Sequence, residues 1–87
     1  MSRFPFASAL ITGASSGIGE AMAHELGRAG VPCILVARRG DRLAELAALY
    51  SGFEVLAADL TTPEGVAAVC ARIGDLTRPI DLVVNNA

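Results

Sequence analysis

A glycine-rich stretch at residues 7–19 constrains the fold of this chain more than any other part of its sequence. It reads Ala-Ser-Ala-Leu-Ile-Thr-Gly-Ala-Ser-Ser-Gly-Ile-Gly. The short apolar run before the first glycine is typical of a strand that is buried on both faces. Apolar residues then recur at helical spacing up to residue 29, which indicates a helix. The three glycines, Gly13, Gly17 and Gly19, therefore predict a tight turn between a strand and a helix.

Such a turn favours the binding of an anion. The first N–H groups of a helix have no intrahelical partner, and the aligned peptide dipoles leave partial positive charge there. Glycines leave room for a phosphate to approach, and the hydroxyls of Ser15 and Ser16 can donate further hydrogen bonds to it. A purely structural turn is the alternative, because Gly and Ser are ordinary turn residues. The order of all eight residues from Thr12 to Gly19 favours a phosphate site.

The composition limits the chain to one domain without a membrane span. With 87 residues, it lies near the small end for a self-sufficient core. It is 53% hydrophobic and 18% charged, with a mean hydropathy of +0.51. No apolar run approaches the ~20 residues that a membrane helix needs, and the N-terminus lacks the apolar core of a signal peptide. We therefore expect a cytoplasmic protein with buried strands and with apolar surface that something outside these residues covers.

Charge and cysteine content exclude further classes of partner. The net charge of −2, without a basic stripe, argues against nucleic acid. Cys33 and Cys70 lie far apart in apolar runs and lack the spacing of metal ligands, so no metal site is expected. We expect two buried free thiols in preference to a disulfide, in keeping with a reducing cytoplasm.

Beyond the glycine-rich turn, the sequence alternates helices and strands. The first helix is expected over 17–29, ended by Gly30 as a left-handed cap, and further strands over 33–37, 53–58 and 80–84. We expect Asp41 to cap the second helix, and Thr62 followed by Pro63 to start the third. The positions expected to face the core are Leu43, Leu46, Ala47 and Tyr50 in the second helix and Val66, Val69, Cys70 and Ile73 in the third.

Four strands alternating with three helices predict an α/β fold with a parallel sheet and right-handed crossovers. A phosphate turn after the first strand favours a Rossmann-type sheet of order 3-2-1-4, with helices on both faces. The fourth strand would then be an exposed apolar edge, and one helix alone would have to cover a whole face of the sheet. Our hypothesis is that residues 1–87 are the incomplete N-terminal part of a single dinucleotide-binding domain, or that a partner completes them.

Two arginines bear on the choice of dinucleotide. Binders of unphosphorylated dinucleotides place an acidic residue about 20 residues beyond the glycines, where it holds the ribose 2′-hydroxyl. Here Arg38 and Arg39 follow the second strand, with no acid before Asp41. A guanidinium can hold a 2′-phosphate through two hydrogen bonds. The alternative is a solvated pair of arginines, one of them paired with Asp41, but the position favours recognition of the 2′-phosphate, first by Arg38.

The polar residues that follow the third and fourth strands could each serve either a turn or a cofactor site. Asp59 follows the third strand and could accept a hydrogen bond from an adenine amino group, although by itself it suits a turn residue or cap near Thr61. Asn85 and Asn86 end the fourth strand and could form a turn, although two amides there also suit a cofactor cleft. His24 has no carboxylate or nucleophile placed to partner it, so we expect a surface histidine.

Together these pieces resemble the classical short-chain dehydrogenase/reductase family. The resemblance rests on Thr12 to Gly19, on Asp59-Leu60 and on Asn85-Asn86-Ala87, and it covers essentially the whole chain. The glycine spacing G-x-x-x-G-x-G is that of the family rather than the general G-x-G-x-x-G. An extended-type epimerase is a weaker option, because its glycine spacing usually differs.

The resemblance implies a Rossmann fold that binds NAD(H) or NADP(H) and transfers a hydride to or from an alcohol or carbonyl of a small-molecule substrate. NADP is expected in preference to NAD because Arg38 matches the basic residue of NADP-preferring members, although many of these carry Lys or Arg where Ser16 stands. It further implies a homo-oligomer when the protein is complete. The implied contacts are Gly13, Ser15, Gly17, Ile18 and Gly19 on the pyrophosphate side, Asp59 and Leu60 at the adenine, and Asn85, Asn86 and Ala87 at the cofactor side of the fourth strand.

The family's catalytic Ser, Tyr and Lys lie beyond the matched motifs, so no catalytic residue is assigned within these 87 residues. Family chemistry needs a tyrosine as general acid/base beside a lysine, and here Tyr50 is the only tyrosine and lysine is absent. Two hypotheses remain. The chain supplies the cofactor-binding half of an NADP(H)-dependent oxidoreductase, or it is a complete non-catalytic nucleotide-binding or interaction module.

Overall fold

The computed structural model describes residues 8–14, 17–38, 40–75 and 77–84. Strands and helices alternate along the chain, as the sequence predicts. The elements are β1 (Ala9–Thr12), α1 (Gly17–Arg28), β2 (Cys33–Ala37), α2 (Gly40–Ala47), β3 (Glu54–Ala57), α3 (Pro63–Ile73) and β4 (Leu82–Val84).

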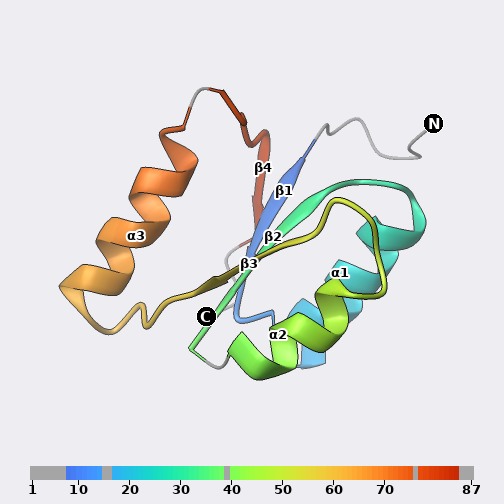
Figure 1. Ribbon diagram of the computed structural model, residues 1–87, viewed down its shortest axis with the longest axis horizontal. Coiled ribbons are helices and arrows are strands. Elements are labelled where there is room, and N and C mark those ends of the chain that lie inside the picture. Colours follow the sequence, from blue (N-terminus) through green and yellow to red (C-terminus); the bar gives the residue numbers. More distant parts are fainter. Residues whose placement is uncertain (1–7, 15–16, 39, 76, 85–87) are drawn as a thin grey trace.

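The four strands form one parallel sheet in the order β3-β2-β1-β4. Helices α1 and α2 lie on one side of this sheet and α3 lies on the other (Figure 1). The predicted α/β fold class, a Rossmann-type sheet of order 3-2-1-4 with helices on both faces, is therefore confirmed.

The apolar runs of the two central strands fill cores on both faces of the sheet. Alternate residues of a strand point to opposite faces. Ile11 and Leu35 accordingly belong to the core beneath α1 and α2, whereas Leu10 and Val36 belong to the core beneath α3. Every residue of β1 and β2 is buried, which explains why these strands have no alternating polar positions.

The outer strands are shorter than the sequence suggests, because each has a neighbour on one side only. Strand β3 ends at Ala57, which pairs with Ala37, the last residue of β2. Strand β4 begins at Leu82, which pairs with Ala9, the first residue of β1. The prediction that β4 forms an exposed edge is confirmed, since Val83 is 50% exposed.

The predicted inner face of α3 is wrong by about one residue. Val69 is buried, but Val66 and Ile73 are exposed, and so is Cys70, which we expected to be a buried thiol. Because α3 alone lies on its side of the sheet (Figure 1), no second helix of the described residues covers these side chains. In the first turn of α3, Gly65 packs so closely that an added Cβ would overlap the carbonyl oxygen of Asp59.

Cysteine Cys33 is buried, as predicted. Burial raises the pKa of its thiol to about 12, because a thiolate would lose its hydration inside the core. The thiol therefore stays protonated and unreactive at neutral pH.

The predicted helix caps are confirmed at two positions and wrong at a third. Gly30 follows α1 with a φ of +83°, and the Thr62 hydroxyl accepts a hydrogen bond from the Gly65 N–H at 3.0 Å. Asp41 is not the cap of α2, because the helix already begins at Gly40. In the first helical turn its carboxylate still faces the positive end of the helix dipole.

His24 has a partner that the sequence did not reveal. Its Nδ1 lies 2.7 Å from the hydroxyl of Tyr50, which follows α2 in a turn. The Tyr50 ring lies directly over Gly27 of α1, so a Cβ at Gly27 would come within 2.5 Å of the ring. This contact attaches the end of α2 to α1 and corrects the expectation of an unpartnered surface histidine.

We expect Gly27→Ala to destabilise the fold by about 1–2 kcal/mol, because displacing the Tyr50 ring outweighs the helix propensity of about 1 kcal/mol that alanine gains. Gly74→Ala is the matched control, since its Cβ would approach nothing closer than the Cys70 carbonyl oxygen at 3.4 Å. Urea unfolding measures both variants. Equal stability of the two would contradict the packing role of Gly27.

No helix within the described residues is long and apolar enough to cross a membrane.

Candidate functional site

The predicted site residues follow the carboxyl ends of three adjacent parallel strands. Gly13 follows β1, Arg38 follows β2 and Asp59 lies two residues beyond β3. Parallel strands end at a common edge, which we call the carboxyl edge. Backbone hydrogen bonds continue the pairing there, from the Ala14 N–H to the Val36 carbonyl at 3.3 Å and from the Ala58 N–H to the Ala37 carbonyl at 3.0 Å.

Glycines lie on both sides of residues 15 and 16 in the connection between β1 and α1. Gly13 has a φ of +62°, a conformation that side-chain-bearing residues rarely adopt. Gly17 opens α1, and a Cβ added there would meet no atom within 4 Å. The packing of the described residues therefore does not demand glycine at position 17. Residue Gly19 is buried, and Ile18 is 74% exposed beside this opening.

Asp59 is held in place by the turn that follows it. The Thr61 N–H and hydroxyl donate to Asp59 Oδ1 at 2.9 and 2.6 Å, and the Thr62 hydroxyl donates to the Asp59 carbonyl at 2.9 Å. The two Thr61 hydrogen bonds lower the pKa of Asp59 below 3.8, with a further contribution from the positive charge of Arg38. The structure thus confirms the turn interpretation of Asp59 near Thr61, and the charge of Arg38 makes the smallest contribution to the lowered pKa.

Gly65, which was not predicted from the sequence, packs directly against Asp59. Only a residue without a Cβ lets the first turn of α3 touch the Asp59 backbone. Glycine has a low helix propensity, so a glycine two residues after a helix-starting proline is unfavourable for the helix itself. That unfavourable placement is the sequence feature that could have indicated a packing role for Gly65.

The fourth strand reaches the same edge through Thr12. The Thr12 hydroxyl donates to the carbonyl oxygen of Val84 at 3.3 Å. The predicted residues Asn85, Asn86 and Ala87 follow immediately but lie outside the described residues, as do Ser15, Ser16 and Arg39. Leu60, next to Asp59, is partly buried against the core beneath α3.

Tyr50 lies away from the carboxyl edge. It stands between the end of α2 and the start of β3, at the amino ends of the strands, where it bonds to His24 and packs on Phe53.

Within residues 8–14, 17–38, 40–75 and 77–84, no three His, Cys, Asp or Glu side chains are grouped to hold a metal ion.

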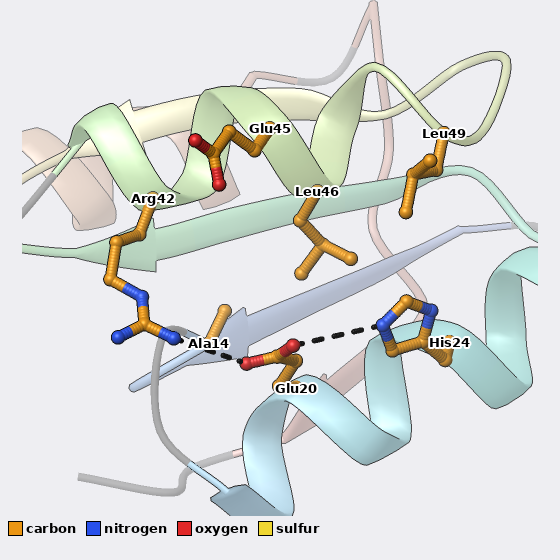
Figure 2. A pocket seen from close by; sticks show the side chains of 7 residues that line it. All are labelled: Ala14, Glu20, His24, Arg42, Glu45, Leu46 and Leu49. Atoms are coloured by element: carbon orange, nitrogen blue, oxygen red, sulfur yellow. Dashed lines mark ion pairs between the residues drawn. The ribbon is translucent and has the colours of Figure 1, made fainter.

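A pocket of about 260 Å³ lies between α1 and α2 (Figure 2). Ala14 lines it directly after Gly13, and Glu20 and Arg42 line it from the first turns of the two helices. Glu20 Oε2 lies 3.8 Å from an Arg42 guanidinium nitrogen, and Glu20 Oε1 lies 3.8 Å from His24 Nε2. The sequence analysis did not single out Glu20 or Arg42, because the pair joins residues 22 positions apart on separate helices.

The family model for short chain dehydrogenases matches residues 7–87. The chain belongs to this family. Serine 3-dehydrogenase from Rhizobium radiobacter is 43% identical over 79 residues, which make up 90% of this chain and 32% of that protein. The similarity to short-chain dehydrogenases therefore extends over nearly the whole length of this chain.

Solved structures of the same family superpose closely on the chain. A short-chain dehydrogenase from Sphingobium yanoikuyae in complex with NADPH gives a TM-score of 0.86 at 45% identity, over 92% of this chain and 33% of that one. L-Sorbose reductase from Gluconobacter frateurii, complexed with NADPH and L-sorbose, gives a TM-score of 0.78 at 44% identity, over 93% of this chain and 33% of that one. The chain spans about a third of the length of these relatives.

We expect Thr61→Val to move the pKa of Asp59 up toward 3.8, because it removes the hydroxyl that contributes most to the lowering. A lowered pKa in the folded state means that ionised Asp59 contributes stability above pH 3.8, and that this stability is lost as the pH falls through the folded-state value. Thr61→Val therefore reduces the acid sensitivity of the fold. Carbon-detected NMR titration of the carboxyl groups measures the shift.

Thr77→Val is the matched control for this titration. Thr77 makes the same two hydrogen bonds to Asp75, whose pKa they and Arg78 lower to about 2. The control variant should raise the pKa of Asp75 and leave that of Asp59 unchanged. An Asp59 pKa that stays the same in Thr61→Val would show that the turn geometry does not control this carboxylate.

Proposed function

We propose that these 87 residues form the N-terminal, cofactor-binding part of a single dinucleotide-binding domain, in an NADP(H)-dependent oxidoreductase that acts on an alcohol or carbonyl of a small molecule. The observation that carries the proposal is the common carboxyl edge of the sheet, to which the start of α1, Arg38 after β2 and Asp59 after β3 all belong. Membership of the short-chain dehydrogenase family supports the reaction class, and the NADPH complexes of two relatives support the cofactor.

The residues present fit the two ends of such a cofactor. The N–H groups at the start of α1 would hold the pyrophosphate, in the space that Gly17 leaves open. Further donors at this phosphate would be Ser15 and Ser16. Exposed Ile18 would pack against the apolar part of the ligand, so that the ligand rather than water covers its side chain.

Arg38 and Asp59 would select the adenosine end. Arg38, with Arg39, would form charge-assisted hydrogen bonds with a 2′-phosphate. Asp59 would accept from the adenine amino group, beside Leu60, and its lowered pKa keeps it an ionised acceptor at neutral pH. Both bonds from Thr61 reach Oδ1, so a ligand can use Oδ2. Asn85, Asn86 and Ala87 would adjoin the same cleft from β4.

When bound, the cofactor would exchange a hydride with the substrate carbon, which NADPH donates to a carbonyl and NADP⁺ accepts from an alcohol. These 87 residues bind and orient the cofactor, and we assign them no proton transfer. Tyr50, the only tyrosine in the sequence, is bonded to His24 near the amino ends of the strands and cannot serve a reaction at the opposite edge.

We further propose a cytoplasmic homo-oligomer that binds neither nucleic acid nor a membrane. The free thiols Cys33 and Cys70 support a reducing compartment, and the net charge of −2 disfavours a polyanion. Exposed Val66, Ile73 and Val83 supply apolar surface for contacts beyond these residues.

The test is a titration of the natural gene product with NADPH and with NADH. We expect NADPH to bind more tightly, and Arg38→Asp to weaken NADPH binding by about tenfold or more while sparing NADH, because a carboxylate repels the 2′-phosphate. Arg28→Asp, at the far end of α1, is the control for a change in charge. Equal affinities for both nucleotides in the unmodified protein would refute the assignment to NADP.

A further inference from the structure

The pocket between α1 and α2 contains an arginine that the proposed cofactor site has not used. Arg42 lies in the first turn of α2, four residues after Arg38, and extends toward Glu20 in the first turn of α1 (Figure 2). Both first turns adjoin the carboxyl edge, because each helix begins just after a strand that ends there. Arg42 is therefore a cation within the neighbourhood of the adenosine end of the site.

Arg42 is held loosely. Its side chain is 55% exposed, and its ion pair with Glu20 spans 3.8 Å between two exposed groups. Exposed pairs of this kind stabilise a fold very little. Arg72 shows the contrast within the same chain, because its side chain is 9% exposed and its Nε lies 2.9 Å from Glu54. Arg72 is a fixed structural cation, whereas Arg42 can change partners at small cost.

The pocket itself is not an anion site. Glu20 and Glu45 both line it, so a phosphate inside it would face two carboxylates. A phosphate outside it, beside Arg38, would instead attract the Arg42 guanidinium away from Glu20. A phosphate dianion accepts stronger, shorter hydrogen bonds from a guanidinium than a distant exposed carboxylate does.

We propose that Arg42 is a second specificity residue for the 2′-phosphate, and that Glu20 competes with the phosphate for it. Without a 2′-phosphate, Arg42 pairs with Glu20. With one, Arg42 turns out of the pocket toward the phosphate, and Glu20 keeps its contact with His24. Glu20 therefore sets how strongly the protein prefers the phosphorylated dinucleotide. This inference rests on the proposed binding of NADP(H).

The test uses adenosine 2′,5′-bisphosphate and 5′-AMP, which differ only in the 2′-phosphate and do not require the catalytic residues. Isothermal titration of the natural gene product at constant ionic strength measures both affinities. We expect Arg42→Ala to weaken bisphosphate binding by about five- to tenfold, the effect of one lost charge-assisted hydrogen bond, and to change 5′-AMP binding by less than about twofold.

The Glu20→Gln variant tests whether Glu20 competes with the 2′-phosphate for Arg42 or instead holds Arg42 in position to bind it. If Glu20 competes for Arg42, this variant binds the bisphosphate about two- to fivefold more tightly, because an amide holds the guanidinium less strongly. The gain should vanish in the double variant Glu20→Gln/Arg42→Ala, since the two residues then have no interaction to lose. Weaker bisphosphate binding in Glu20→Gln would overturn the competition.

The matched control is the ion pair of Arg28 and Glu25, which is equally exposed but lies in the last turns of α1. Arg28→Ala and Glu25→Gln change the net charge by the same amounts and should leave both affinities unchanged. An Arg42→Ala variant that behaves like Arg28→Ala, in a protein that still prefers the bisphosphate and depends on Arg38, overturns this inference alone. An unmodified protein that binds the bisphosphate no better than 5′-AMP overturns the proposed function as well.

Discussion

The parallel pairing of β1 with β2 and of β2 with β3 is the constraint on which the candidate site depends. It brings the carboxyl ends of three strands to one edge, so that residues 13, 38 and 59 become neighbours although they are far apart in the chain. Burial of both central strands on both faces stabilises this arrangement. The site consists of turns and helix starts that the rigid sheet holds at its end.

Two close contacts then refine the geometry at this edge. Gly13 turns the chain after β1 with a positive φ, and α1 begins at Gly17, where the first N–H groups of a helix have no intrahelical partner. Gly65 allows α3 to approach the Asp59 backbone, which holds that carboxylate where the charge of Arg38 acts on it. In both places the absence of a side chain matters, because it permits the backbone conformation at Gly13 and the close packing of α3 at Gly65.

The sequence predicted the features that local chemistry determines. Continuous apolar runs identified β1 and β2, and glycines with special conformations, Gly13 and Gly30, marked the turns. It did not predict contacts that arise only when separate elements pack, such as His24 with Tyr50 or Glu20 with Arg42. The exposure of Val66 and Ile73 on α3 likewise depends on what packs beside that helix, which the apolar pattern of the helix itself does not specify. The roles of Arg38 and Asp59 toward a ligand remain predictions.

The most direct measurement of the central claim is an amide NMR spectrum of the protein before and after addition of NADPH. If the carboxyl edge binds the cofactor, the largest shifts occur at the amides of Gly13, Gly17 and Gly19 and near Arg38 and Asp59. Gly52, in the turn at the opposite edge of the sheet, should not respond. Shifts confined to that opposite edge, or no shifts at saturating NADPH, would contradict the account.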